Sequence, residues 1–342
     1  MSDTRDRILG TLYGQAIGDA LGLPAEFKSP NAIRELQKNW GNWPNAYAAT
    51  GRSQYGWKAG EWSDDTEQAI CLLDAYLNGV KDGEAPDAPV SLFRVSDLFV
   101  KWAQENGKGM GNHTWNVLQD GLFLLDPHAV SADVWERSGR QSAPNGAVMR
   151  TAYMGIMRPH DLAWTAQEAA STAKTTHYDP RCVASAVAVS VTIAALVTGS
   201  TVPEAIQTGV RYGGKHHGDV AKYATMSLDE LDLAEGLEPK QRRVPIGFTY
   251  KCMGAGFWAL REFQRRDDEM HDDLWGDRFL NVLQKVILAG GDADTNGAVA
   301  GAMLGAVAGM QQMELSHPWM IQGLVDKQQL DSRAVALFGI QG

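Results

Sequence analysis

Apolar residues recur along most of this chain at the three- and four-residue spacing of an α-helix, and this pattern predicts the fold class. No run of alternating apolar and polar positions is long enough to indicate a central sheet. Many of the predicted helices open with Asp, Ser, Thr or Pro, the residues that helix starts favour. The sequence therefore predicts an all-α protein, with helices at Arg5–Leu23, Asp65–Asn78, Ser91–Gln104, Thr114–Leu125, Gly146–Met157, Leu162–Lys174, Pro180–Val197, Pro203–Tyr212, Phe248–Arg265, Asp272–Ala289, Asp294–Met310 and Ile321–Ala336.

Three irregular stretches interrupt the helical pattern, at Ser29–Glu61, Asp82–Val90 and Asp229–Arg243. The first is rich in Gly, Asn and Trp, which makes it too aromatic for a disordered linker. We predict that it forms an ordered loop. Since no composition break or fixed repeat divides the chain, residues 1–342 are expected to form a single domain.

Two long uncharged segments, Cys182–Thr201 and Thr295–Met313, approach the length that spans a bilayer. Both are dominated by Ala, Gly, Ser and Val, and neither has a flank rich in Lys and Arg or a belt of Trp and Tyr. We therefore interpret them as helices buried on all sides within a soluble protein, with no membrane as a partner.

Charge and cysteine content narrow the class of protein. The net charge of −10 argues against a nucleic-acid partner, because phosphate binding needs clustered Lys and Arg. Three cysteines without a CxxC motif are typical of reduced thiols, and Met1–Gly10 lacks the apolar run of a secretory signal. The expected location is the cytoplasm.

Two stripes of glycine at four-residue spacing lie on single helical faces. Glycine lowers helix propensity, so such stripes are expected where two backbones pack closely. The first stripe contains Gly10, Gly14, Gly18 and Gly22, and the second contains Gly297, Gly301 and Gly305. We interpret both as packing devices without a chemical role.

Two acidic segments lie far apart in the chain, each just before a predicted helix. We call them the first acidic cluster (Ser63–Thr66) and the second acidic cluster (Gly290–Asn296). Helix capping, which contributes about 1 kcal/mol, explains one Asp per helix but not adjacent or alternate acids beside glycines. Like charges at this spacing repel unless protons or a cation lie among them. If the clusters meet in space, their carboxylate and hydroxyl oxygens suit Mg²⁺ or Mn²⁺.

Four segments, in chain order, carry a family resemblance. They are Gly14–Gly22 leading to Glu26, then Trp62–Thr66, then Asn145–Arg150 followed by Thr176 and His177, and finally Gly290–Gly297. In these segments the chain resembles the ADP-ribosylglycohydrolases, the family of the dinitrogenase-reductase-activating glycohydrolase and of the ADP-ribosylarginine and ADP-ribosylserine hydrolases. Each segment alone is a weak signal, whereas the second and fourth in this order are a strong one.

The resemblance implies a mostly orthogonal helical bundle that holds two divalent ions, Mg²⁺ or Mn²⁺, in a central cleft. By position, the metal ligands would be Ser63, Asp64, Asp65, Asp292, Asp294 and Thr295. Asp294 would bridge the two ions. Because both ends of the chain would then build one site, the resemblance also favours a single domain.

The resemblance also implies residues for catalysis and for ADP-ribose. Glu26 would act as an acid or a base, a choice that the sequence leaves open, and Asp64 and Asp294 would complete the catalytic set. The residues that would line the ADP-ribose pocket are Gly109 and Gly111 in the glycine-rich loop 107–112, with Asn145, Gly146, Met149, Arg150 and His177. Without the resemblance, that loop reads as a flexible turn. His216 and His217 read as an exposed loop pair, not a metal site.

The reaction implied is hydrolysis of the bond between ribosyl C1 and an acceptor atom, with ADP-ribose as product. The substrate would be an ADP-ribosylated protein or a small ADP-ribosyl conjugate. An acidic cleft favours a cationic guanidinium acceptor, which points to arginine over serine. A binding or toxin-blocking immunity protein with little turnover is the alternative, and a structural protein is a third. A non-enzymatic chain would be expected to lose a metal carboxylate or Glu26, and here all are present.

Overall fold

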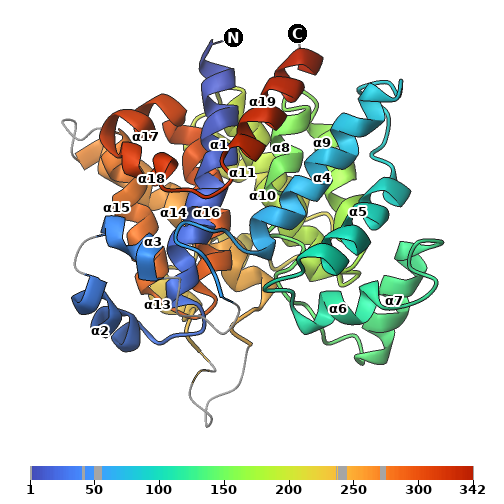
Figure 1. Ribbon diagram of the computed structural model, residues 1–342, viewed down its shortest axis with the longest axis horizontal. Helices are drawn as coiled ribbons and strands as arrows, with labels where there is room; N and C mark the ends of the chain where they lie inside the picture. Colours follow the sequence, from blue (N-terminus) through green and yellow to red (C-terminus); the bar gives the residue numbers. More distant parts are fainter. Residues whose placement is uncertain are drawn as a thin grey trace.

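The protein is all-α in the residues that the computed structural model describes, namely 2–40, 43–49, 56–235, 237, 245–269 and 275–341 (Figure 1). Within those residues the only strand-like pairing is two isolated bridges, Lys28 with Gly291 and Pro144 with Phe248. The α-helices are α1 (Ser2–Gly22), α2 (Pro30–Trp40), α3 (Ala46–Ala49), α4 (Asp64–Lys81), α5 (Leu92–Glu105), α6 (Asn112–Leu118), α7 (Pro127–Arg137), α8 (Met154–Met157), α9 (Leu162–Ala173), α10 (Pro180–Val197), α11 (Val202–Gly213), α12 (Val220–Thr225), α13 (Leu228–Leu231), α14 (Thr249–Glu269), α15 (Trp275–Leu288), α16 (Ala293–Ala308), α17 (Met310–Ser316), α18 (Pro318–Gln322) and α19 (Gln328–Gln341). Three short 3₁₀ helices are η1 (Leu23–Ala25), η2 (Trp43–Asn45) and η4 (Thr151–Tyr153).

The first helix and the late helix α16 pack against each other through their glycine stripes. A Cβ atom added at Gly14 would overlap the carbonyl oxygen of Gly301, and one added at Gly18 would overlap that of Gly297. The two backbones are thus in contact over most of their length, as the stripes predict. Figure 1 shows α1 running through the middle of the view, with α16 beside it. This pairing brings the two ends of the chain together.

Helix α10 has the length and hydropathy of a membrane span, but 89% of it is buried inside the protein. All residues of α16 are likewise buried. The two uncharged segments are therefore core helices, as their small side chains indicate. Small residues let neighbouring helices approach closely, so α10 packs against both α9 and α11.

The apolar segment Gly146–Met157 is not one helix, which corrects that prediction. It forms a turn, then η4, then the single turn of α8. The backbone N–H of Asn145 donates to the carbonyl oxygen of Gly247 over 2.9 Å, which fixes the chain outside helical geometry. A tertiary contact thus overrides the local pattern here.

Two further predicted helices have different limits. The segment predicted at Ile321–Ala336 is divided between α18 and α19, because Gly323 ends α18 and Asp326 adopts a left-handed φ of 58°. The helix predicted to reach Leu125 ends at Leu118. Turns follow it up to Asp126, which begins the next helix, α7.

The stretch Ser29–Glu61 is not simply a loop, because it contains α2, whose first residue is Pro30. Helix α7 was also missed, although Asp126 caps it and Pro127 takes its first position. In both cases the start signal was present and the polar surface of a short helix concealed it. Some residues of the irregular stretches lie outside the described residues, namely 41, 42 and 50–55 of the first and 236 and 238–243 of the third.

Candidate active site

The two acidic clusters meet in space at the starts of α4 and α16. The Thr295 hydroxyl donates to Asp65 Oδ2 over 3.3 Å, and the Ser63 hydroxyl donates to the same oxygen over 2.8 Å. Ser63 is the N-cap of α4, and Asp292 is the N-cap of α16. Because both helices begin here, their N-terminal dipoles favour the negative charges gathered at this point.

A third helix contributes Asp19, which was not predicted as a site residue from the sequence. Asp19 Oδ1 accepts from the backbone N–H of Ser63 over 2.9 Å. Its Oδ2 accepts from the backbone N–H of Thr66 over 3.1 Å and from the Thr66 hydroxyl over 2.6 Å. Asp19 therefore fixes the first acidic cluster to α1. The signal that could have found it is a carboxylate placed beside a helical stripe of glycines.

Two groups of three carboxylates are close enough to share a cation. Oxygen atoms of Asp19, Asp65 and Asp294 all lie within 4.8 Å of one another. Oxygen atoms of Glu26, Asp292 and Asp294 do the same, so Asp294 belongs to both groups. This is the position that a bridging ligand between two ions would take.

Burial sets the protonation of these acids when no cation is present. Burial, then the charge of Asp19, raises the pKa of both Asp64 and Asp65 well above the usual value. Burial, then the charge of Glu26, does the same for Asp294. So many acids can stay ionised together only if a positive charge compensates them.

The residues fit a divalent cation by their chemistry and by an unpaired atom. Asp65 Oδ1 is buried and has no hydrogen-bond partner among the described residues. Most buried polar atoms in proteins have a partner, so this unpaired carboxylate oxygen is available to a cation. All the side chains gathered here offer oxygen atoms, which Mg²⁺ and Mn²⁺ prefer.

Glu26 lies at the solvent side of the buried acids, just after η1. Burial raises the pKa of Glu26 to about 7, and the charge of Asp292 adds to this. The chain around it is clamped to the second acidic cluster, because Phe27 N–H donates to Gly291 O over 2.7 Å and Gly291 N–H donates to Lys28 O over 3.0 Å. This clamp brings an early carboxylate to the start of a late helix.

The glycine-rich loop 107–112 lies against the first acidic cluster. Gly109 has a φ of 82°, and a Cβ atom there would come within 2.6 Å of Asp64 Oδ1. Only glycine satisfies both the left-handed backbone and this close approach. Gly111 is the N-cap of α6 and has open space around it. The loop thus leaves its backbone accessible beside the carboxylates.

Asn145 joins the predicted pocket residues to the acids. Its side-chain amide donates to Asp292 Oδ2 over 2.7 Å. At Gly146, a Cβ atom would come within 2.7 Å of the His177 ring, so these two predicted residues are in contact. His177 is buried, and its ring centroid lies 4.7 Å from that of His113. Met149, three residues after Gly146, is also buried. Their roles in binding ADP-ribose stay predictions.

Arg150 is fully buried and donates to groups of the protein itself. Its guanidinium donates to Gln68 Oε1 over 2.8 Å and to Thr176 Oγ1 over 2.7 Å. Gln68 in turn donates to Asp64 Oδ2 over 2.9 Å, so Arg150 supports the first acidic cluster through one intermediate residue. Burial lowers the pKa of Arg150 to about 9. A direct contact between Arg150 and substrate stays a prediction.

A cavity of about 1090 Å³ opens beside Asn145, and we call it the site cavity. It adjoins the acids at Gly247, where a Cβ atom would lie 3.4 Å from Asp292 Oδ2 and 3.6 Å from Asn145 Oδ1. One lining residue, Asn112, lies in the loop 107–112 predicted from the sequence, and the others were missed because they come from many separate segments. The lining consists of Asn112, His113, Asn116, Val134, Arg137, Ser138, Gln141, Ser142, Ala143, Pro144, Arg181, Asp219, Tyr223, Pro245, Gly247 and Phe248.

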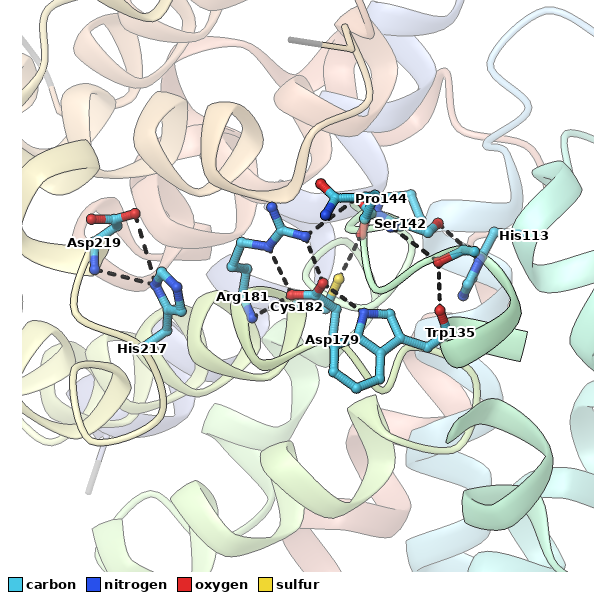
Figure 2. A network of polar contacts seen from close by, with 11 residues as sticks. His113, Trp135, Ser142, Pro144, Asp179, Arg181, Cys182, His217 and Asp219 are labelled. Carbon is cyan, nitrogen blue, oxygen red and sulfur yellow. Dashed lines mark hydrogen bonds and ion pairs between the residues drawn. The ribbon is translucent and has the colours of Figure 1, made fainter. Parts of the chain in front are cut away.

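Polar contacts link lining residues of the site cavity to the residues behind them (Figure 2). Asp179 accepts from Arg181 Nη2 over 2.6 Å and from the Trp135 indole N–H over 2.8 Å. Ser142 Oγ lies 3.2 Å from His113 Nδ1 on the same wall. At the other end of the view lie His217 and Asp219. His217 is half-buried, which corrects the expectation of an exposed histidine pair, whereas its neighbour is exposed.

Similarity to known proteins extends over nearly the whole chain. A family model described as ADP-ribosylglycohydrolase matches residues 1–341. The chain belongs to the ADP-ribosylglycohydrolase family. Like other members, it is a hydrolase that acts on ADP-ribosyl linkages.

Relatives of this glycohydrolase are distant but cover most of its length. The chain is 25% identical over 349 residues to the ADP-ribosylarginine hydrolase Tri1 of Serratia proteamaculans, covering 98% of this chain and 80% of the relative. It is 23% identical over 312 residues to the ADP-ribosyl-dinitrogen reductase glycohydrolase of Rhodospirillum rubrum, covering 90% and 87%. A solved structure named ADP-ribosylglycohydrolase-related protein complex has a TM-score of 0.67 at 22% identity, with both chains covered along 100% of their length. This last likeness confirms the fold.

Proposed function

We propose that this glycohydrolase is metal-dependent and cleaves the bond between ribosyl C1 and the acceptor of an ADP-ribosylated protein, with arginine favoured, or of a small ADP-ribosyl conjugate. One observation carries the proposal: the two acidic clusters and Glu26 form a buried cage of oxygen ligands beside a cavity of nucleotide size. Pockets of several hundred Å³ are typical of sites for small molecules.

The ions would be two Mg²⁺ or Mn²⁺, held by residues from both acidic clusters. Asp294, which belongs to both groups of three carboxylates, would help to hold both ions. When bound, the ions would supply Lewis acidity and fix the hydroxyl groups of the ribose. The ligand set is Ser63, Asp64, Asp65, Asp292, Asp294 and Thr295.

Glu26 is the residue suited to move a proton. In the metal-free protein, burial raises the pKa of its carboxyl group to about 7, and bound cations would lower that pKa. In the deprotonated form it would take a proton from the attacking water. In the protonated form it would give one to the leaving group. Either role uses its place between the buried acids and solvent.

The site cavity would take the ADP-ribose part of the substrate. Tyr223 and Phe248 offer aromatic faces to a base, with ring centroids 5.9 Å apart in edge-to-face geometry. The loop 107–112 would offer backbone N–H groups to the diphosphate, with Gly109 and Gly111 allowing close approach. Asn145 connects this cavity to Asp292 and so would place the reacting ribose at the acids.

The preference for arginine is supported by charge and by the relatives' names. A guanidinium acceptor is cationic and fits an acidic site, whereas a serine acceptor gains nothing from it. Proteins of Serratia proteamaculans and Pseudomonas putida to which this chain is similar are named ADP-ribosylarginine hydrolases. We also propose a cytoplasmic location, because Cys71, Cys182 and Cys252 are free and buried.

The test is release of ADP-ribose from arginine-, serine- and nucleotide-linked substrates, with Mg²⁺ or Mn²⁺ and with EDTA. We expect release from the arginine substrate with a divalent ion and none with EDTA. If EDTA leaves the release of ADP-ribose unchanged, the enzyme does not depend on a metal and that part of the proposal is wrong. Tight binding of ADP-ribose without release from any substrate would instead favour the immunity protein.

A further inference from the structure

Phe27 is an exposed aromatic residue in a strained conformation directly after Glu26. Its φ is 54°, in the left-handed region that L-residues avoid, and 54% of the residue is exposed. For a bulky residue this backbone conformation costs about 1–2 kcal/mol. A large apolar ring in water adds a further cost. Strain kept beside a reactive carboxylate is a common mark of function.

Backbone hydrogen bonds fix the chain at Phe27 and at the residue that follows it. Its own N–H donates to Gly291 O, and the next residue, Lys28, donates its backbone N–H to Ala25 O over 3.1 Å. Core packing does not explain a ring that faces solvent. The clamp therefore holds the backbone of Phe27 beside the second acidic cluster, with its side chain exposed.

Asp292 is close both to the site cavity and to Glu26. Asn145, which donates to Asp292, adjoins the lining residues of the cavity. Glu26 shares a group of three close carboxylates with Asp292, and neither Glu26 nor Phe27 lines the cavity. With ADP-ribose in the cavity, we place the acceptor beside Glu26, and Phe27 is the next residue in the chain.

We propose that Phe27 determines acceptor specificity, because its ring stacks on the planar guanidinium of ADP-ribosylated arginine. This inference rests on the proposed function and assigns its arginine preference to one side chain. A guanidinium stacks on an aromatic face through its positive charge and its flat shape, and a neutral serine side chain does neither. The ammonium group of Lys28, the next residue, donates to the backbone carbonyl oxygen of Glu26 over 3.3 Å.

The experiment compares kcat/KM for ADP-ribosyl-arginine and ADP-ribosyl-serine in Phe27→Leu, Phe27→Gly and Phe27→Tyr. Leucine keeps apolar area but has no π-face, and glycine removes both the ring and the strain. We expect Phe27→Leu and Phe27→Gly to lower the arginine-to-serine selectivity roughly 3- to 30-fold, the range of one cation–π contact. Phe27→Tyr keeps a π-face and should lose less of this selectivity. Phe93→Leu is the matched control, because Phe93 is 64% exposed on α5.

Inhibition by ADP-ribose gives a second readout that needs no turnover of serine substrate. Phe27→Leu should weaken arginine turnover more than it weakens ADP-ribose inhibition. Equal losses of kcat/KM for both substrates would mean that the residue only holds Glu26 in place, and this would overturn the proposal. A loss of kcat/KM in Phe27→Leu that is absent in Phe27→Gly would lead to the same conclusion. Unchanged selectivity would overturn it too. If the wild-type protein releases ADP-ribose from neither substrate, the proposed function fails first and this inference with it.

Discussion

The Thr295 hydroxyl donates to Asp65 Oδ2 across 3.3 Å, although 230 residues separate the two in the chain. Helix α1 makes this contact geometrically possible. Its glycine stripe lets α16 lie directly against it, and its Asp19 holds the start of α4. One core helix thus positions both acidic clusters.

Asp294→Ala should abolish turnover, because it removes the carboxylate that both groups of three share. We expect kcat to fall about 100-fold or more, since losing even an outer partner of a metal ligand costs 10- to 100-fold. Thermal unfolding with and without Mg²⁺ provides a second measurement. The rise in melting temperature on adding Mg²⁺ should disappear, because a ligand stabilises only the state that binds it.

The matched control for this variant is Asp126→Ala. Asp126 also begins a helix, and its Oδ1 accepts from Ala129 N–H over 3.0 Å, but it lies outside the acidic clusters. Its loss should cost about 1 kcal/mol of stability through the missing cap and leave kcat unchanged. Wild-type, Mg²⁺-dependent rates in Asp294→Ala would rule out the two-ion hypothesis.

Asp19→Asn should weaken metal binding, because Asp19 both fixes the first acidic cluster and lies within reach of a cation shared with Asp65 and Asp294. An amide can accept at one position only, so its NH₂ group would face a backbone N–H of Ser63 or of Thr66. We expect the Mg²⁺ concentration for half-maximal activity to rise about 10- to 100-fold. A Mg²⁺ titration of the initial rate measures this.

Asp161→Asn is the control for Asp19→Asn. The Asp161 carboxylate caps α9 by accepting from Trp164 N–H over 3.0 Å, and Asn is as good an N-cap as Asp. It should leave the Mg²⁺ dependence as it is. If Asp19→Asn shows the wild-type Mg²⁺ titration, the first acidic cluster does not depend on α1 for its geometry.

Without metal, the protein should become less stable as pH rises. Burial raises the pKa of Asp19 to about 6 and that of Glu26 to about 7, so the folded protein holds protons that the unfolded chain has released. The stability from these neutral acids is present below the ordinary values of 3.8 and 4.5, and it is lost as pH rises through about 6 to 7. In EDTA, the melting temperature should therefore fall between pH 5 and pH 8.

Mg²⁺ should reduce that fall, because a cation stabilises the ionised acids. Glu26→Gln should flatten the pH profile in EDTA, since the amide does not titrate. A melting temperature in EDTA that stays constant over this range would contradict the burial of these acids, on which the metal hypothesis depends.

The sequence predicts those elements that local signals define. Helix α10 has the predicted limits, because Asp179 caps its start and Pro180 occupies its first position. The segment Gly146–Met157 was wrongly predicted as a helix, since a contact with Gly247 holds it open. Local pattern carries no information on a contact across a hundred residues.

The same distinction between local signals and distant contacts applies to the candidate site. The two acidic clusters were visible in the sequence as unusual local composition, and the structure brings them together. The contribution of Asp19 depends on Ser63 and Thr66, and the exposure of Phe27 depends on Gly291. Such roles arise only when distant segments pack, so no local pattern shows them.

Gly301→Ala should destabilise the protein and also weaken its metal binding. A Cβ atom at this position would overlap the carbonyl oxygen of Gly14, which is backbone and cannot move aside as a side chain can. We expect a loss of about 3 kcal/mol or more in the free energy of unfolding, the upper end for overpacked cores. Gly121→Ala is the control, because its Cβ atom would meet nothing within 4 Å. Urea unfolding gives the stability, and a Mg²⁺ titration of activity gives the second effect. Separating α1 from α16 displaces Asp19 from Asp294, so a variant that lost stability but kept wild-type Mg²⁺ affinity would contradict the role assigned to this helix pair.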